Sequence, residues 1–199
     1  MEKIKLTKTE LKKQKDNLKR YNRYLPTLYI KKQQLRKEIE RVTAQLFVLD
    51  NAFSKKMDEI TPWISLLGEE VGLSDLIRLK EIDIKNDNIA GVDIPVFVKA
   101  QINIKRYDLF VYPLWIDRAI DILYAMICLQ AEKAVLDYQR LLLSRELRIT
   151  SQRVNLFEQV KIPEAKEGIR RISIYLGDQQ TAAVVWARMA KKKLQEADK

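Results

Sequence analysis

The sequence predicts a mainly α-helical protein in which N-terminal and C-terminal helices pair as a long antiparallel two-helix coiled coil. A small central β-hairpin and short helical connections are expected between them. Three observations support this fold class. Apolar residues recur every seven positions over the first third of the chain, a second helical pattern fills the last third, and alternating apolar residues lie between them. Five glycines and five prolines among 199 residues, with 32% charged residues, favour long helices over many turns.

The first predicted helix covers residues 4–67. Every seventh residue from Ile4 to Leu67 is apolar, with the exception of Lys32. A seven-residue repeat keeps one stripe against a partner helix only when the helices supercoil, so the pattern predicts a coiled-coil seam. Pro26 lacks a backbone donor and predicts a kink in this helix without a change of heptad phase. The seam residues of interest are Leu11, Leu18, Leu25, Ile39, Leu46 and Phe53.

Residues 68–112 form a central segment with a different period. Over residues 82–104 the apolar side chains alternate with mostly polar ones, which is typical of β-strands. We expect a hairpin at about residues 79–98 with its turn at residues 85–88, and Pro95 requires an edge strand or a bulge. Because two strands alone are marginally stable, the hairpin must pack on the helices or on another protein. A partner is favoured, since a rod has little concave surface.

The second long helix is predicted over residues 114–195. Its seam steps by three and four residues from Ile162 to Ala190, whereas the upstream seam has another phase. This difference predicts a stutter near residues 160–163, and Pro163 predicts a kink there. Two helices joined through a hairpin imply one elongated domain of residues 1–199 that folds back on itself. The seam residues of interest are Ile162, Ile169, Ile172 and Leu176.

Basic residues are concentrated at the two ends of the chain. Residues 1–41 contain 14 Lys and Arg against 5 acids, and residues 161–199 contain 9 against 5, whereas residues 42–160 contain 14 against 17, so all of the net positive charge of +10 comes from the two ends. If both ends lie together, they form a basic tip that suits nucleic acid, anionic lipid or an acidic protein. A solvated helix surface is the simplest alternative. The candidate tip residues are Lys12, Lys13, Arg188, Lys191, Lys192 and Lys193.

The residue inventory argues against catalysis. The chain has no histidine, which is the commonest general base and metal ligand, and a single cysteine, Cys128. The five glycines form no phosphate-binding loop. We therefore expect a non-enzymatic protein without a metal or cofactor. Because the chain lacks a signal peptide and a long apolar run, we expect a cytoplasmic protein, peripheral to a membrane and without direct membrane insertion.

Two motifs carry a family resemblance. The run Asn88-Ile89-Ala90-Gly91-Val92 with Pro95 after it, and the run Arg153-Val154-Asn155 with Ile162-Pro163 after it, resemble motifs in the D subunits of the V-type and A-type rotary ATPases. The resemblance covers nearly the whole chain in order. Departures occur at Pro26 and over residues 177–180.

The resemblance implies a central-stalk rotor shaft of a V/A-type rotary ATPase. Such a shaft transmits torque between a hexamer of catalytic A and regulatory B subunits and a membrane ring that moves ions, during ATP hydrolysis or synthesis. The implied partners are this A/B hexamer at the terminal end, and the small F subunit and a funnel-shaped adaptor of the membrane ring at the other end. Candidate partner contacts on the hairpin are Ile82, Ile84, Asn88, Ile89, Gly91, Ile94, Pro95, Val96 and Phe97.

Two other functions are compatible with a basic coiled coil. A nucleic-acid-binding protein would use the excess of positive charge in residues 1–41, and its affinity would fall steeply with salt through counterion release. The tyrosines of that region, however, are not spaced as a stacking surface, and we expect no nucleic-acid partner. A static tether between proteins would need the helices but would have no use for a small sheet at one end.

Overall fold

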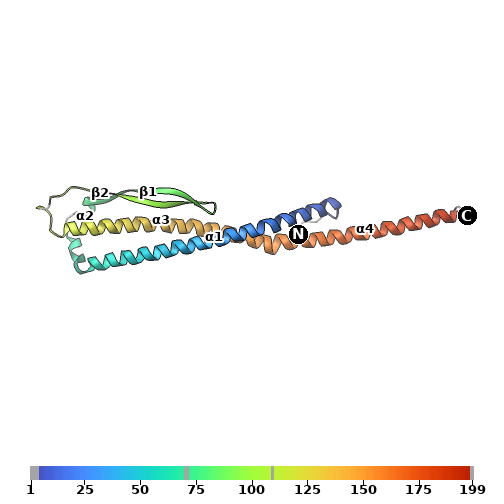
Figure 1. The fold of residues 1–199 in the computed structure, drawn as a ribbon, viewed down its shortest axis with the longest axis horizontal. Coiled ribbons are helices and arrows are strands. Elements are labelled where there is room, and N and C mark those ends of the chain that lie inside the picture. Colours follow the sequence, from blue (N-terminus) through green and yellow to red (C-terminus); the bar gives the residue numbers. More distant parts are fainter. Residues whose placement is uncertain (1–4, 70–71, 109, 198–199) are drawn as a thin grey trace. The chain divides into compact units, whose positions relative to one another are not determined.

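The computed structural model describes residues 5–69, 72–108 and 110–197. It confirms the predicted fold class, because two long helical segments pack against each other and a two-stranded antiparallel sheet lies between them in the chain (Figure 1). In chain order the elements are α1 (Lys8–Ile60), the 3-10 helix η1 (Thr61–Gly68), α2 (Leu73–Leu76), β1 (Ile77–Ile89), β2 (Val92–Ile104), α3 (Ile116–Asn155), the π-helix η2 (Leu156–Lys161) and α4 (Ile162–Ala197).

The chain forms two compact units, each of which contains part of α1 and part of the C-terminal helical segment. Unit 1 consists of residues 1–31 and 150–199, and unit 2 consists of residues 32–149. In unit 1 the ring of Tyr21 stacks on the ring of Phe157, with 5.3 Å between their centroids. In unit 2 the ammonium of Lys133 on α3 pairs with the carboxylate of Asp50 on α1. A residue further along α1 contacts a residue earlier in the C-terminal helical segment, so the two helices are antiparallel, as predicted.

Unit 2 is built around a core to which both helices and the hairpin contribute. Leu35 of α1, Leu143 of α3 and Ile94 of β2 belong to one cluster and are at most 2% exposed. The hairpin therefore packs on the chain's own helices, and the prediction that favoured a partner protein over these helices was wrong. Two helices side by side leave a wider surface than a single rod, and the hairpin covers it. A second cluster joins Leu76, Ile77, Ile116 and Ile120.

The hairpin is longer than predicted and turns at a different place. β1 and β2 pair from Ile77 opposite Ile104 to Ile89 opposite Val92, with register shifts after Leu79 and after Asp83. The two-residue turn consists of Ala90 and Gly91, which have φ angles of 52° and 76°. Positive φ at both positions is what a type I′ hairpin turn requires. Residues 85–88, the predicted turn, pair instead with residues 93–96.

The first helix ends earlier than predicted. α1 stops at Ile60, and residues 61–68 continue as the 3-10 helix η1. Pro62 lies in the first turn of η1, where its missing N–H leaves no helical bond unmade. The indole N–H of Trp63 donates to the carbonyl of Glu59 at 2.9 Å across this junction. Pro26, in contrast, lies inside α1, which remains one α-helix.

A π-helix interrupts the C-terminal segment where the sequence predicts a stutter. In η2 the N–H of Ile162 donates to the carbonyl of Phe157, five residues earlier in the chain. A π-turn holds more residues than an α-turn and so shifts the phase of the residues that follow. Pro163 follows directly and supplies no N–H to the α-helical ladder. The change of seam phase therefore coincides with a local change of helix type.

Candidate interaction surfaces

A groove of about 630 Å³ lies between the hairpin, α1 and α3 in unit 2. Ile89, Val96 and Phe97 line it from the hairpin, and Val48 lines it from α1. Charged groups contribute to the wall from all three sides. This combination of apolar walls and a few polar groups is typical of a surface that binds another molecule. The charged lining residues are Arg41, Asp87 and Glu132.

Two large apolar side chains on α1 are exposed, and sequence reasoning missed them. Phe47 and Val48 are 68% and 65% exposed. They stand between the seam residues Leu46 and Leu49, so four consecutive residues of one helix are apolar. A helix that pairs along a narrow seam buries only some of four consecutive residues. The length of this apolar run was the signal that could have identified the extra surface.

The candidate hairpin residues divide into exposed and structural ones. Ile84 is 54% exposed, and Ile82, Ile89, Val96 and Phe97 are half-buried. Asn88 and Gly91 are exposed at the turn, where the Asn88 side chain accepts from the Gly91 N–H at 3.0 Å and donates to Asp93 at 2.6 Å. The carbonyl of half-buried Pro95 accepts a hydrogen bond from the side chain of Gln139. Ile94 is 2% exposed and belongs to the chain's own core, so we no longer assign it to a partner surface.

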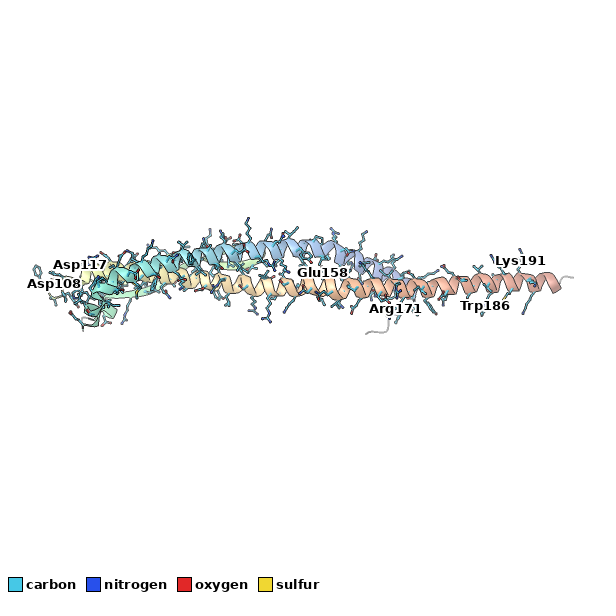
Figure 2. All side chains as sticks on the ribbon, turned by 90° about the horizontal axis from the view of Figure 1, so that it is seen from below. Asp108, Asp117, Glu158, Arg171, Trp186 and Lys191 are labelled. Carbon is cyan, nitrogen blue, oxygen red and sulfur yellow. The ribbon has the colours of Figure 1, made fainter. Side chains whose placement is uncertain are left out.

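The candidate basic tip residues lie in two separate places of unit 1. α1 begins at Lys8, and α4 continues past it, so Lys191 is on a part of α4 beyond α1 (Figures 1 and 2). Lys12 and Lys13 follow in the second turn of α1, and Arg188 precedes Lys191 by about one turn of α4. All the candidate tip residues are exposed, Lys192 and Lys193 included. The chain ends Met1 and Lys199 lie outside the described residues.

Residues 177–193 of α4, which we call the α4 extension, are exposed at every position. Several of them are large and apolar. Trp186 is 75% exposed, and Figure 2 shows it together with Lys191 on a stretch where no other described element lies alongside. Sequence reasoning assigned Trp186 to the paired seam, and the structure corrects this because α1 begins too late to cover it. The other large apolar residues are Val184, Val185 and Met189.

The predicted seam residues occupy the inner side of the paired helices. In α1, Leu46 is 5% exposed, and in α4, Ile172 has no exposed surface. The remaining ones are half-buried: Leu11, Leu18, Leu25, Ile39, Phe53, Ile162, Ile169 and Leu176.

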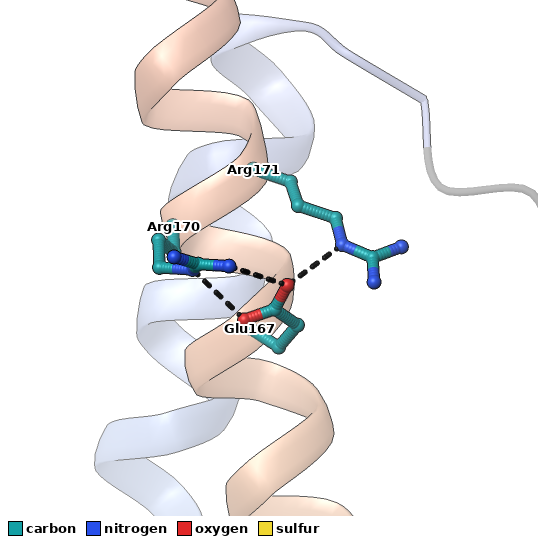
Figure 3. A network of polar contacts seen from close by, with 3 residues as sticks. All are labelled: Glu167, Arg170 and Arg171. Carbon is teal, nitrogen blue, oxygen red and sulfur yellow. Dashed lines mark hydrogen bonds and ion pairs between the residues drawn. The ribbon is translucent and has the colours of Figure 1, made fainter.

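Ion pairs on α4 use some of its positive charge within the helix. The carboxylate of Glu167 accepts from Arg170 at 3.0 Å and from Arg171 at 2.8 Å (Figure 3). These hydrogen bonds lower the pKa of Glu167, and the same contact raises the pKa of Arg170. All three side chains are at least 40% exposed, so the network contributes little stability. Two arginines of α4 are thus held against an acidic side chain of the same helix.

Two side-chain contacts join α1 to η2 in unit 1. Beside the ring stack of Tyr21 on Phe157, the hydroxyl of Tyr29 donates to the carboxylate of Glu158 at 2.7 Å. That hydrogen bond raises the pKa of Tyr29 above its usual value of 10.0. One aromatic and one polar contact thus join α1 to the opposite helical segment at its π-helical turn, η2.

The described parts of the chain contain no group of His, Cys, Asp and Glu side chains suited to hold a metal ion. Within the same parts, no helix has both the length and the apolar character needed to cross a bilayer.

Comparisons with known proteins agree on one family. The family model of the ATP synthase D subunits matches residues 10–192. The D subunit of the V-type ATP synthase of Borreliella burgdorferi is 50% identical over 194 residues, which cover 98% of this chain and 96% of that protein. The protein of the same name in Chlamydia trachomatis serovar L2 is 32% identical, with 97% of both chains covered. A match that includes α1, the hairpin and most of α4 in one continuous range means that this chain belongs to the family of ATP synthase D subunits.

Proposed function

We propose that the chain is the central-stalk rotor shaft of a V/A-type rotary ATPase and has no catalytic role of its own. It transmits torque between the A/B hexamer and the membrane ring, during ATP hydrolysis or synthesis coupled to ion transport. The observation that carries this proposal is a match to the D-subunit family over residues 10–192 on a chain made of two paired long helices. The protein acts in the cytoplasm, peripheral to the membrane, as part of the complex.

Packing supports the mechanical part of the proposal. Close-packed side chains resist deformation, so a continuous seam transfers twist along a helix pair. The seam of α1 is half-buried or buried at each described heptad position from Leu11 to Ile60. Two different elements are added to the paired helices, the hairpin in unit 2 and the α4 extension in unit 1. A rotor shaft that binds different partners needs two such different attachment sites.

We assign the partners to these surfaces as follows. The α4 extension enters the A/B hexamer, because an apolar helix face with Trp186 and Met189 exposed must be covered by another molecule. The basic residues at positions 188 and 191–193, with Lys12 and Lys13, form weak bearing contacts with the hexamer. The small F subunit binds at the hairpin groove, where Val48 is 65% exposed. The funnel-shaped adaptor of the membrane ring binds unit 2.

A rotation assay tests the role as a shaft. Cys128 is the only cysteine, so Cys128→Ser followed by Lys85→Cys on the exposed part of β1 gives one attachment point for a bead. With the F subunit and an immobilised A/B hexamer, ATP should drive rotation of the bead in one direction. A hexamer that hydrolyses ATP with the chain bound and a stationary bead would contradict the proposal.

A truncation separates the role of the α4 extension from that of the rest of the chain. A variant ending at Leu176 keeps the buried seam residue Ile172 but lacks every residue of the extension. We expect it to keep the binding of the F subunit and to lose at least about tenfold in affinity for the hexamer, since a few apolar and aromatic anchors supply most binding energy. Equal affinity of both forms for the hexamer would exclude the extension as the contact.

A further inference from the structure

The π-helical turn η2 interrupts a regular spacing of seam residues in the C-terminal helical segment. Leu143, Thr150 and Phe157 follow one another at intervals of seven residues, and so do Ala165 and Ile172. The step from Phe157 to Ala165 is eight residues. All five side chains except half-buried Phe157 are at most 3% exposed, so the seam is maintained on both sides of the irregular step. Because a π-turn takes up more residues than an α-turn, η2 absorbs the extra residue.

Side-chain packing is weaker in η2 than on either side of it. None of its residues, 156–161, all of which the structure describes, is buried. Val154 before it and Ala165 after it are 1% and 3% exposed. The apolar residues Leu156 and Val160 of η2 are 44% and 39% exposed. The stretch with the irregular backbone therefore lacks the buried contacts that stiffen the seam before and after it.

Two prolines weaken the backbones of the helices in unit 1. Pro163, directly after η2, supplies no N–H to the carbonyl of Gln159, and its ring crowds that carbonyl. Pro26 has the same effect on the carbonyl of Asn22 inside α1. Each helix of the pair thus has one place where its hydrogen-bond ladder is incomplete.

Contacts between the helices place these two weak points side by side. Tyr21 of α1 stacks on Phe157. Tyr29 donates a hydrogen bond to Glu158, which Figure 2 shows next to α1. Pro26 lies between the two tyrosines in the sequence of α1, so it stands opposite η2. The ring stack and the hydrogen bond hold the helices together where both backbones are weakened.

We propose that η2 and Pro26 form a compliant joint within unit 1, at which the helix pair yields to twist. This inference rests on the proposed function, in which the A/B hexamer holds the α4 extension and torque acts along unit 1. The hydrogen bonds of a π-turn can rearrange here without moving a packed side chain, since the side chains of η2 are exposed or half-buried. Load therefore deforms unit 1 first at this level, while the packed seam elsewhere transfers twist.

The test removes the extra residue and the proline together. Deletion of Gln159 combined with Pro163→Ala restores a seven-residue step from Phe157 to Ala165, so the segment should become a continuous α-helix. Gln159 is exposed, so its removal takes away no packed side chain. Pro163→Ala alone is the matched control, because it keeps the extra residue and with it the π-turn.

A second deletion controls for the loss of one residue as such. Removal of exposed Ser144 shortens the step from Leu143 to Thr150 to six residues and turns Thr150 and Val154 off the seam, although both are at most 1% exposed. Tm should fall by about 5 °C or more. Deletion of Gln159 should instead leave Tm no lower than in Pro163→Ala. An equal loss of Tm for the two deletions would mean that η2 absorbs no extra residue, and the joint would be excluded.

Hydrogen exchange of the full chain tests the joint without any partner. In the unaltered chain and in Pro163→Ala, amides of residues 158–162 should exchange at least about tenfold faster than those of residues 168–174. In the Gln159 deletion variant the difference should fall below about twofold. Equal exchange of the two stretches in the unaltered chain, or fast exchange that survives the deletion, would show that η2 is a rigid insertion and would overturn the proposal.

The rotation assay tests whether the joint yields in the shaft. With ATP withheld, the hexamer holds the α4 extension, and a bead on Lys85→Cys reports the angular fluctuation. The variance of the bead angle should be at least about one third smaller in the Gln159 deletion variant than in Pro163→Ala, because a packed, continuous helix resists deformation. Addition of Pro26→Ala should reduce it further. Equal variance in all forms would exclude the joint, whereas a bead that ATP does not turn on the unaltered chain would remove the proposed function itself.

Discussion

Three positions after each residue of the series from Ile4, α1 has a second heptad series, and units 1 and 2 bury this second series to different depths. Tyr21 and Leu28 of α1, in unit 1, are half-buried, whereas the next two positions of that series, Leu35 and Val42 in unit 2, have no exposed surface. The helix and the repeat are the same in both units. What differs is the hairpin, since Ile94 and half-buried Val92 of β2 pack against the core of unit 2. A heptad repeat thus determines which side of a helix faces inward, and a third element determines how completely it is covered.

The largest expected effect on stability comes from truncating one buried isoleucine in each unit. Ile94 in unit 2 and Ile172 in unit 1 are 2% and 0% exposed, so Ile→Ala deletes equally buried groups. We expect Ile94→Ala to cost about 3–4 kcal/mol and Ile172→Ala about 2 kcal/mol, because a two-helix seam collapses more easily around a cavity. Urea denaturation followed by circular dichroism measures both.

Tryptophan fluorescence separates the units in the same experiment. Trp63 and Trp115 belong to unit 2 and Trp186 to unit 1, and Trp115 packs on a core cluster. For Ile94→Ala the urea midpoint of unfolding should therefore fall when it is followed by fluorescence. For Ile172→Ala it should fall mainly when it is followed by circular dichroism. A larger loss for Ile172→Ala would show that the hairpin adds no packing of consequence.

The next largest effect concerns the polar link between the hairpin and α3. Gln139 is 5% exposed, and its side chain donates to the carbonyl of Pro95. Gln139→Leu keeps the volume but leaves that carbonyl without this donor, at a cost of about 1–3 kcal/mol. Gln130→Leu on the same helix is the matched control, because residue 130 is exposed and such changes stay within about 0.5 kcal/mol. Equal stability of the two variants would mean that apolar contacts alone hold the hairpin.

Sequence alone predicted the elements that depend on periodicity. The heptad series of α1, the antiparallel return and the phase change near Pro163 follow from spacing, because a helix must keep its apolar stripe against a partner. Alternation of period two likewise predicted the hairpin. Its turn was misplaced because residues 85–88 are rich in turn formers, whereas Ala90 takes a positive φ that alanine rarely adopts.

Surfaces were predicted less well, since they depend on where one element ends beside another. The exposure of Trp186 results from α1 beginning at Lys8 while α4 runs on to Ala197. A repeat pattern contains no information on that overhang. Phe47 was missed for a related reason, because an apolar residue outside a period has no assigned side until the neighbouring elements are placed.

The smallest predicted effect compares one tyrosine hydrogen bond in each unit. Donation to Asp117 raises the pKa of Tyr107 from 10.0 to about 12, and donation to Glu158 raises that of Tyr29. The folded state therefore favours the neutral phenol, so the stabilisation is complete below pH 10 and is lost as the pH rises through the folded pKa. Tyr107→Phe should lower Tm at pH 8, and the difference from the unaltered chain should shrink between about pH 10 and 12. Tyr29→Phe should also lower Tm at pH 8, because it removes the hydrogen bond to Glu158 in unit 1. A Tm difference for Tyr107→Phe that stays constant across this range would exclude the hydrogen bond as its origin.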